Sequence, residues 1–185
     1  MLEWIYLTNR VRYSEIFENQ EIRENDFCHN SLIKQENRIF GKLATEALNL
    51  DENEISRLYE EDLYQLILHE VGHTLGLNHN FAASTLHNNS DVHNPEITYK
   101  EGLSSSVMDY HALNIAPIGV EQGQYADVKP GKYDILAIKY GYSPELLKKD
   151  LDNLLEKYST KEYLFGNDGD DMRSPGKGID PRINT

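Results

Sequence analysis

Apolar residues recur every three or four positions along much of this chain, which is the spacing of an amphipathic helix. The pattern is loose in residues 1–30 and becomes clear at residue 31, where Ser31 is a suitable N-cap for a helix that ends near Asn49. No stretch of residues 1–68 shows the alternation of apolar and polar positions that is typical of a half-buried strand. The pattern therefore predicts a mainly α fold.

A longer helix is predicted from about Glu52 to Gly76. Asp51 and Glu54 have the spacing of a capping box at its start. The apolar run LYQLIL, residues 63–68, indicates that this helix is buried. Gly76 is expected to end it, because glycine adopts a positive φ at low cost and so lets the chain turn.

In the rest of the chain, the residue pattern predicts loops and two further helices. Residues 80–106 are polar and predict a loop with one helical turn at residues 96–100. The prolines and glycines of residues 114–131 predict an ordered surface loop. Pro130 suits the first turn of a helix that ends near Gly141, and its apolar stripe is Tyr133, Leu136, Ala137 and Tyr140. Another helix is expected from Ser143, and all these apolar stripes are expected to pack into the core.

Composition narrows the class of protein. The 185 residues are 39% hydrophobic and 26% charged, which is ordinary for a soluble domain, and no apolar run is long enough to span a membrane. The net charge of −13 argues against binding to nucleic acid or to an anionic membrane surface. The single cysteine, Cys28, excludes an internal disulfide and a cysteine-rich zinc cluster.

Residues 69–79 carry the pattern H-E-x-x-H-x-x-G-x-x-H. His69 and His73 stand four residues apart, so on a helix both imidazoles project from one face and can reach one zinc ion at about 2.0–2.1 Å. A turn at Gly76 brings His79 back as a third ligand. Three histidines leave the fourth position of the metal open, which indicates a catalytic zinc site rather than a structural one.

Glu70 follows the first histidine and stands beside the metal position, where a base can take a proton from an attacking water. Further along, the segment SSSVMDY, residues 104–110, places Met108 where it can lie beneath the imidazoles as a polarisable floor. Tyr110 can then direct its hydroxyl towards the open position and stabilise a developing oxyanion. The remaining candidates His87, His93 and His111 are expected to be surface histidines.

These motifs resemble the metzincins, zinc peptidases with an extended three-histidine motif and a downstream Met-turn. The resemblance rests on HEVGHTLGLNHNFAAS, GLSSSVMDY, residues 114–142 and the tail GKGIDPR. Within this family the chain more closely resembles a bacterial branch of exported metalloproteases, one of which is made alongside a cholera-like toxin. The resemblance implies one zinc ion on His69, His73 and His79, Glu70 as the base, Met108 in the Met-turn and Tyr110 near the metal. It also implies export to the periplasm or beyond, although the opening MLEWIYLTNR is not a signal peptide.

The chain departs from the family pattern in two ways. Asn80 follows the third histidine, where astacins carry Glu, reprolysins Asp and matrixins usually Ser. Metzincins also place a mostly parallel sheet before the active-site helix, whereas residues 1–68 predict helices. We therefore expect a single, truncated zincin-like catalytic domain over residues 1–185. It would comprise an upstream helical part (1–62), the zinc site (63–110) and a C-terminal helical part with its tail (111–185).

The function predicted from the sequence is that of a zinc-dependent endopeptidase acting on a peptide or protein substrate. Because a peptide needs an edge strand to pair with, we expect this chain to cleave poorly by itself and a longer form to cleave well. Two alternatives stay open. One is a zinc hydrolase of a non-peptide amide, and the other is a metal-binding or partner-binding fragment without catalytic activity.

Overall fold

The computed structural model describes residues 30–143, 148–158 and 160–167. The chain divides into two compact units, residues 1–31 and residues 32–185, and the fold below is that of the second. The predictions for residues 1–29, Cys28 among them, and for the tail from residue 168 lie outside the described residues.

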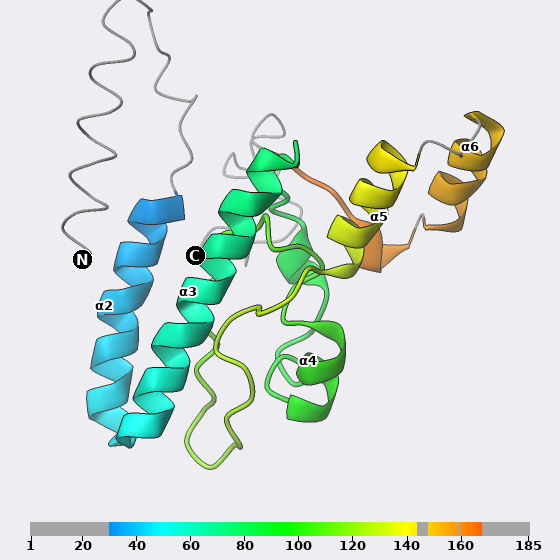
Figure 1. Cartoon of the computed structure of the whole chain (residues 1–185). Helices are drawn as coiled ribbons and strands as arrows, with labels where there is room; N and C mark the ends of the chain where they lie inside the picture. The colour runs from blue at the N-terminus through cyan, green and yellow to red at the C-terminus, as the bar shows by residue number, and fades with distance from the viewer. Residues whose placement is uncertain (1–29, 144–147, 159, 168–185) are drawn as a thin grey trace, which may run out of the picture. The chain divides into compact units, whose positions relative to one another are not determined.

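Helices and loops make up the described part of the chain (Figure 1). The α-helices are α2 (Asn30–Leu48), α3 (Glu52–Thr74), α4 (Pro95–Glu101), α5 (Lys132–Tyr142) and α6 (Lys148–Lys157), with 3-10 turns η2 (Ala83–Thr85) and η3 (Lys161–Tyr163). The residues that the structure describes contain no strand, so the mainly α prediction is confirmed for them. None of their helices combines the length and the apolar character that crossing a bilayer requires.

Both ends of α3 follow from local sequence. The Asp51 carboxylate accepts hydrogen bonds from the backbone N–H groups of Asn53 and Glu54, each at 2.9 Å, which confirms the predicted N-cap. The capping box is not closed as predicted, because the Glu54 carboxylate instead accepts from Arg57 at 2.7 Å. At the other end Gly76 has a φ of 84°, so the predicted glycine stop is confirmed.

Other boundaries differ from the sequence-based expectations by a residue or two. Ser31 already lies inside α2, so it is not the N-cap of that helix. Pro130 precedes α5 instead of forming its first turn, because Gly131 is the N-cap. The helical turn predicted at residues 96–100 is confirmed as α4, which Asn94 caps. The expected start of α6 lies partly in residues 144–147, outside the described residues.

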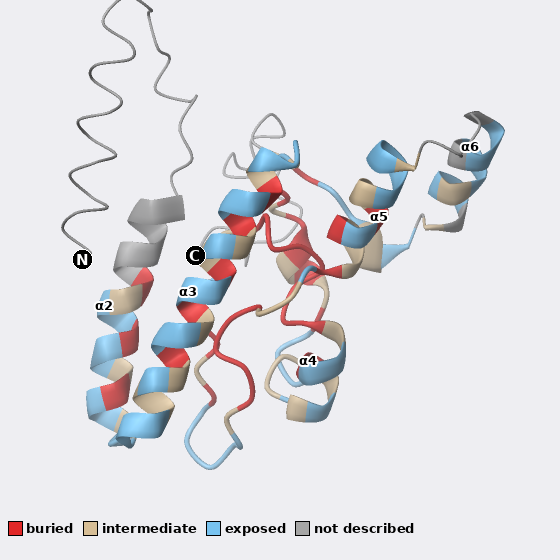
Figure 2. Cartoon of the chain, in the orientation of Figure 1, coloured by how far each residue is buried: buried red, intermediate tan, exposed pale blue. Residues whose placement is uncertain are grey.

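The hydrophobic core is formed by α3 and the loop that was predicted to lie on the surface. Leu58 packs with Leu113, Tyr125 and Ala126, all of them buried. Figure 2 shows buried positions in red along α3 and along the loops beside it. The backbone N–H groups of Tyr125 and Ala126 donate to the Glu61 carboxylate at 2.6 and 3.3 Å. Since α3 itself satisfies these buried polar groups, the loop can enter the core, and the surface-loop prediction is wrong for residues 123–127.

The apolar stripes do not all face this core. Ile39, Phe40 and Leu43 of α2 are exposed, and so are Leu63 and Ile67 of α3. Apart from Leu58, the buried positions of these two helices are small or polar, among them Gly41, Asn37 and Gln65. A Cβ added at Gly41 would lie 3.0 Å from the Leu113 side chain. Helix α2 therefore approaches the core with its small and polar face, and the prediction that every stripe is buried is wrong.

The N-terminus of α5 lies directly against the backbone of the serine segment at residues 104–106. A Cβ added at Gly131 would lie 2.1 Å from the backbone oxygen of Ser105, which cannot move away as a flexible side chain could. We expect Gly131→Ala to lower the free energy of unfolding by about 1–3 kcal/mol, the usual cost of overpacking. Chemical denaturation measures this loss.

Gly141→Ala is the matched control for this substitution. Gly141 also belongs to α5, but no atom lies within 4 Å of an added Cβ. Alanine is the better helix former, so this variant should be as stable as the parent or more stable by up to about 1 kcal/mol. Equal stability of the two alanine variants would contradict the close contact at Gly131.

Candidate metal centre

Three histidines converge from α3 and the turn that follows it. Ligand nitrogens of His69, His73 and His79 all lie within 4.8 Å of one another. The Nε2 atoms of His73 and His79 are 3.1 Å apart. His79 reaches the other two because the backbone reverses at Gly76, where the Leu77 N–H donates to the carbonyl of Gly72 at 3.0 Å. Among the described residues this is the only group of three or more such side chains with metal-binding spacing.

The outer nitrogens of two of these rings meet backbone carbonyls. His69 Nδ1 lies 2.8 Å from the oxygen of Val107, and His73 Nδ1 lies 3.0 Å from the oxygen of Leu77. A carbonyl oxygen can only accept, so each Nδ1 donates its N–H to it, and in the neutral ring Nε2 then keeps its lone pair. Zinc-binding histidines are oriented by such contacts. The three residues therefore fit a zinc ion by their spacing, and two of them also by the orientation of their rings.

Two aromatic side chains surround the third histidine. The hydroxyl oxygen of Tyr110 lies 2.8 Å from His79 Nε2, and the two ring centroids are 4.7 Å apart. Phe81 lies 5.4 Å from His79 and 5.2 Å from Tyr110, again between ring centroids. The structure thus places the Tyr110 hydroxyl beside a nitrogen of the histidine cluster. The spacing of the motif did not single out Phe81.

Glu70 follows His69 on α3 and is exposed to solvent. The core-facing side of α3 carries Leu58, Gln65, His69 and Gly72, so Glu70 lies outside that buried row.

Met108 is completely buried against the helix that carries the histidines. A Cβ added at Gly72 would lie 2.3 Å from the Met108 sulfur. Gly72 immediately precedes His73, so the missing side chain leaves room for Met108 under this part of α3. The backbone N–H of Asn80 donates to the Met108 carbonyl at 3.1 Å, which ties the residue after the third histidine to the same methionine.

Asn80, the residue after the third histidine, is itself fully buried. Its side-chain amide donates to the carbonyl of Leu164 at 3.0 Å, and its side-chain oxygen accepts from the N–H of Gly166 at 3.1 Å. The N–H of Phe81 donates to the Gly166 carbonyl at 2.7 Å. The turn that carries the third histidine is thereby joined to the segment after η3.

Two buried carboxylates hold the 103–110 loop, which contains Met108. Asp127 accepts from the backbone N–H groups of Leu103 and Ser104 at 2.7 and 3.1 Å, and from the Ser104 hydroxyl at 2.7 Å. Asp134 of α5 accepts from the Val107 N–H at 2.9 Å and from the Ser106 hydroxyl at 2.5 Å. The loop is therefore fixed by side chains that follow it in the sequence.

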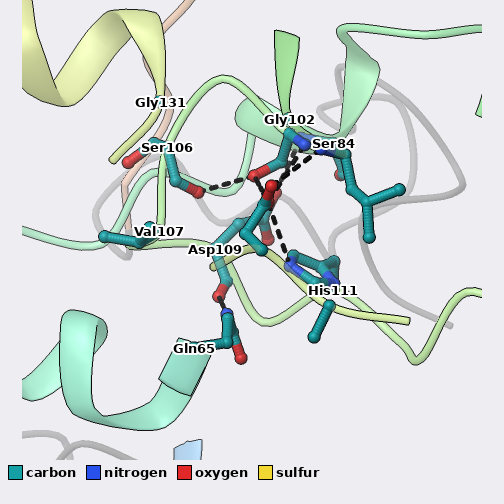
Figure 3. Close-up of polar contacts among 12 residues, drawn as sticks. Gln65, Ser84, Gly102, Ser106, Val107, Asp109, His111 and Gly131 are labelled. Carbon is teal, nitrogen blue, oxygen red and sulfur yellow. Dashed lines mark hydrogen bonds and ion pairs between the residues drawn. The ribbon is translucent and has the colours of Figure 1, made fainter. Parts of the chain in front are cut away.

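A third buried carboxylate belongs to the loop itself. Asp109 accepts from the backbone N–H of Ser84 at 2.8 Å, and the amide of Gln65 donates to its backbone carbonyl at 3.4 Å. Figure 3 shows Asp109 between these two residues. Burial raises the pKa of the Asp109 carboxyl. The contact with Gln65 joins the loop to α3, four residues before His69.

The pKa values of the other two carboxylates are shifted in opposite directions. Burial raises the pKa of Asp134, and its hydrogen bonds do not outweigh this effect. Burial also acts to raise the pKa of Asp127, but the hydrogen bond and charge of His111 outweigh it and leave that pKa lowered. His111 Nε2 lies 3.3 Å from the Asp127 carboxylate.

The other histidines that the structure describes, His87, His93 and His111, are not part of the cluster. The prediction that His87 and His111 are surface histidines is wrong, since His87 is buried with its Nε2 2.8 Å from the Gly102 carbonyl, and the His111 side chain is 9% exposed. His93 is partly buried. The carboxylates of Asp127 and Asp134 could not be predicted from the sequence, because no spacing links them to the motif.

A family model described as Met-zincin matches residues 51–185, which include all three histidines, Glu70 and Met108. No curated protein and no solved structure matches the chain.

The geometry predicts one zinc ion per chain at this cluster. His73→Ala should reduce the bound zinc from one equivalent to nearly none, because two imidazoles hold zinc much more weakly than three. Metal analysis after dialysis measures the stoichiometry. His87→Ala is the control, because His87 is a buried histidine outside the cluster and its loss should leave zinc binding unchanged. Full zinc binding by His73→Ala would rule out the assignment.

Proposed function

The chain belongs to the Met-zincin family. Because this family suggests a zinc-dependent metallopeptidase, we propose that the chain is a zinc endopeptidase. The observation that carries the proposal is the convergence of His69, His73 and His79. Two of these rings are oriented by backbone carbonyls so that Nε2 faces the cluster. The site of the proposed reaction is the space in front of these nitrogens, and the substrate is a peptide or protein.

The three histidines would hold the zinc ion through their imidazole nitrogens. Zinc bound there would polarise the scissile carbonyl and lower the pKa of the attacking water. The neutral histidine ligands leave the positive charge of the ion uncompensated, which favours both effects.

Glu70 is proposed as the general base. Its carboxylate accepts the proton of the attacking water and later delivers it to the amine that leaves when the peptide bond breaks. The exposed position of Glu70, directly after His69 on α3, supports this role. Its place outside the buried row of α3 also leaves it able to reach a substrate.

Tyr110 is proposed to stabilise the oxyanion that forms on the scissile carbonyl. Its hydroxyl lies 2.8 Å from His79 Nε2, so a small movement of the ring would direct it to the neighbouring substrate oxygen. Met108 is proposed as the methionine of the Met-turn, a buried support beneath the histidines. Its burial and its contact with Gly72 support this role.

Glu70→Gln is expected to retain zinc and to lower kcat for a peptide substrate by about 10²- to 10⁴-fold, the usual contribution of a general base. The amide keeps the size of the side chain but cannot accept the proton. Glu60→Gln is the matched control, because Glu60 is an exposed glutamate of the same helix. Equal peptide hydrolysis by Glu70→Gln and the parent would exclude the mechanism, and hydrolysis of only non-peptide amides by the parent would exclude the proposed substrate.

Tyr110→Phe is expected to lower kcat by about 10²-fold with little change in KM, because an oxyanion donor acts mainly in the transition state. Zinc content should stay at one equivalent. Tyr64→Phe removes the hydroxyl of an exposed tyrosine on α3 and should leave the kinetics unchanged. A Tyr110→Phe variant with parental kcat would show that the hydroxyl takes no part in catalysis.

A further inference from the structure

Val107 is where the histidine cluster meets the interior of the domain. Its carbonyl oxygen accepts from His69 Nδ1 at 2.8 Å, and its own N–H donates to the Asp134 carboxylate at 2.9 Å. One residue therefore connects a histidine of α3 with a buried acid of α5. The connection is made entirely through the backbone of Val107, so the identity of the Val107 side chain does not affect it.

Asp134 controls the peptide units on both sides of Val107. One carboxylate oxygen accepts directly from the Val107 N–H. The other accepts from the Ser106 hydroxyl, whose oxygen in turn accepts from the Met108 N–H at 3.1 Å. The Met108 N–H and the Val107 carbonyl belong to the same planar peptide unit. Holding this N–H therefore sets the direction of the carbonyl that meets His69.

The carboxylate suits this arrangement chemically. It accepts only, and it receives three donors: the Val107 N–H, the Ser106 hydroxyl and the Gly131 N–H at 2.8 Å. Asp134 is 3% exposed, so water cannot readily replace it as an acceptor. Gly131 is the N-cap of α5, and this third bond fixes the carboxylate to the start of its own helix.

We propose that Asp134 is a positioning residue of the zinc centre, which holds the Val107 carbonyl and through it the tautomer and ring orientation of His69. This inference rests on the zinc site of the proposed function. It adds a residue of α5 that acts on His69 through the backbone of Val107. Loss of the carboxylate frees the peptide unit after Val107 to rotate, and His69 then loses a fixed acceptor for its Nδ1–H.

Asp127 provides a matched control, because it bonds to the same 103–110 loop. It is also a buried aspartate that accepts two backbone N–H groups and one serine hydroxyl, but these belong to Leu103 and Ser104. Asp127→Ala removes these three bonds and also the 3.3 Å contact with His111, so it leaves at least as many buried donors without an acceptor as Asp134→Ala does. The Val107 contact distinguishes them.

The test compares the zinc-loaded full chain with these two alanine variants. Competition with a chelator should show zinc binding about tenfold weaker in Asp134→Ala, the lower end of the effect of losing an orienting contact. In Asp127→Ala it should stay within about twofold of the parent. NMR of protein with ¹⁵N-labelled histidine should show faster solvent exchange of the His69 Nδ1–H proton in Asp134→Ala only. A merely structural role would weaken both variants alike and leave this proton protected.

Parental zinc affinity and proton exchange in Asp134→Ala would overturn the proposal, and so would equal changes in both variants. If Asp134→Ala does not fold, Asp134→Ser is measured in the same way, since serine keeps a polar group in the pocket but is too short to reach the Val107 N–H. Neither measurement needs a substrate. A parent that binds zinc but cleaves no peptide would therefore refute the endopeptidase and leave this result standing, whereas a parent that binds no zinc would refute both.

Discussion

The hydrogen bond between His69 Nδ1 and the Val107 carbonyl, 2.8 Å long, is the contact on which the rest of the site depends. It fixes the proton on the outer nitrogen, so that Nε2 is available to a metal. It also joins α3 to the 103–110 loop, which contains Met108 and leads to Tyr110. If this bond were lost, His69 would no longer be fixed relative to the loop that carries the methionine and the tyrosine.

Holding a loop in this way requires acceptors for its buried N–H groups, and carboxylates supply them. Asp127 satisfies the beginning of the loop and Asp134 the part around Val107. A helix or a sheet would satisfy such groups through its own backbone, but an irregular loop cannot. The acids come from the loop before α5 and from α5 itself, so the C-terminal part of the domain is needed to shape a site whose ligands all precede it.

The site was predictable from sequence where its geometry is local. The spacing of His69 and His73 on one helix face, the stop at Gly76 and the Asp51 cap all follow from the rules of a single helix. The fold was less predictable where contacts link distant segments. The loop with Tyr125 and Ala126 was expected on the surface, yet it forms the core because Glu61 satisfies its backbone. The apolar face of α2 was expected inside, but Gly41 and its polar neighbours face the core instead. Asp134 could not be recognised, since its role depends on a contact with a loop 27 residues earlier.

The central claim is that His69, His73 and His79 together bind one zinc ion and leave room for water or substrate. X-ray absorption spectroscopy of the zinc-loaded chain tests it most directly, because the method identifies the atoms around the metal and their distances. The account predicts three imidazole nitrogens at about 2.0–2.1 Å, one further oxygen and no sulfur. A sulfur ligand, or fewer than three imidazoles in the parent chain, would contradict it.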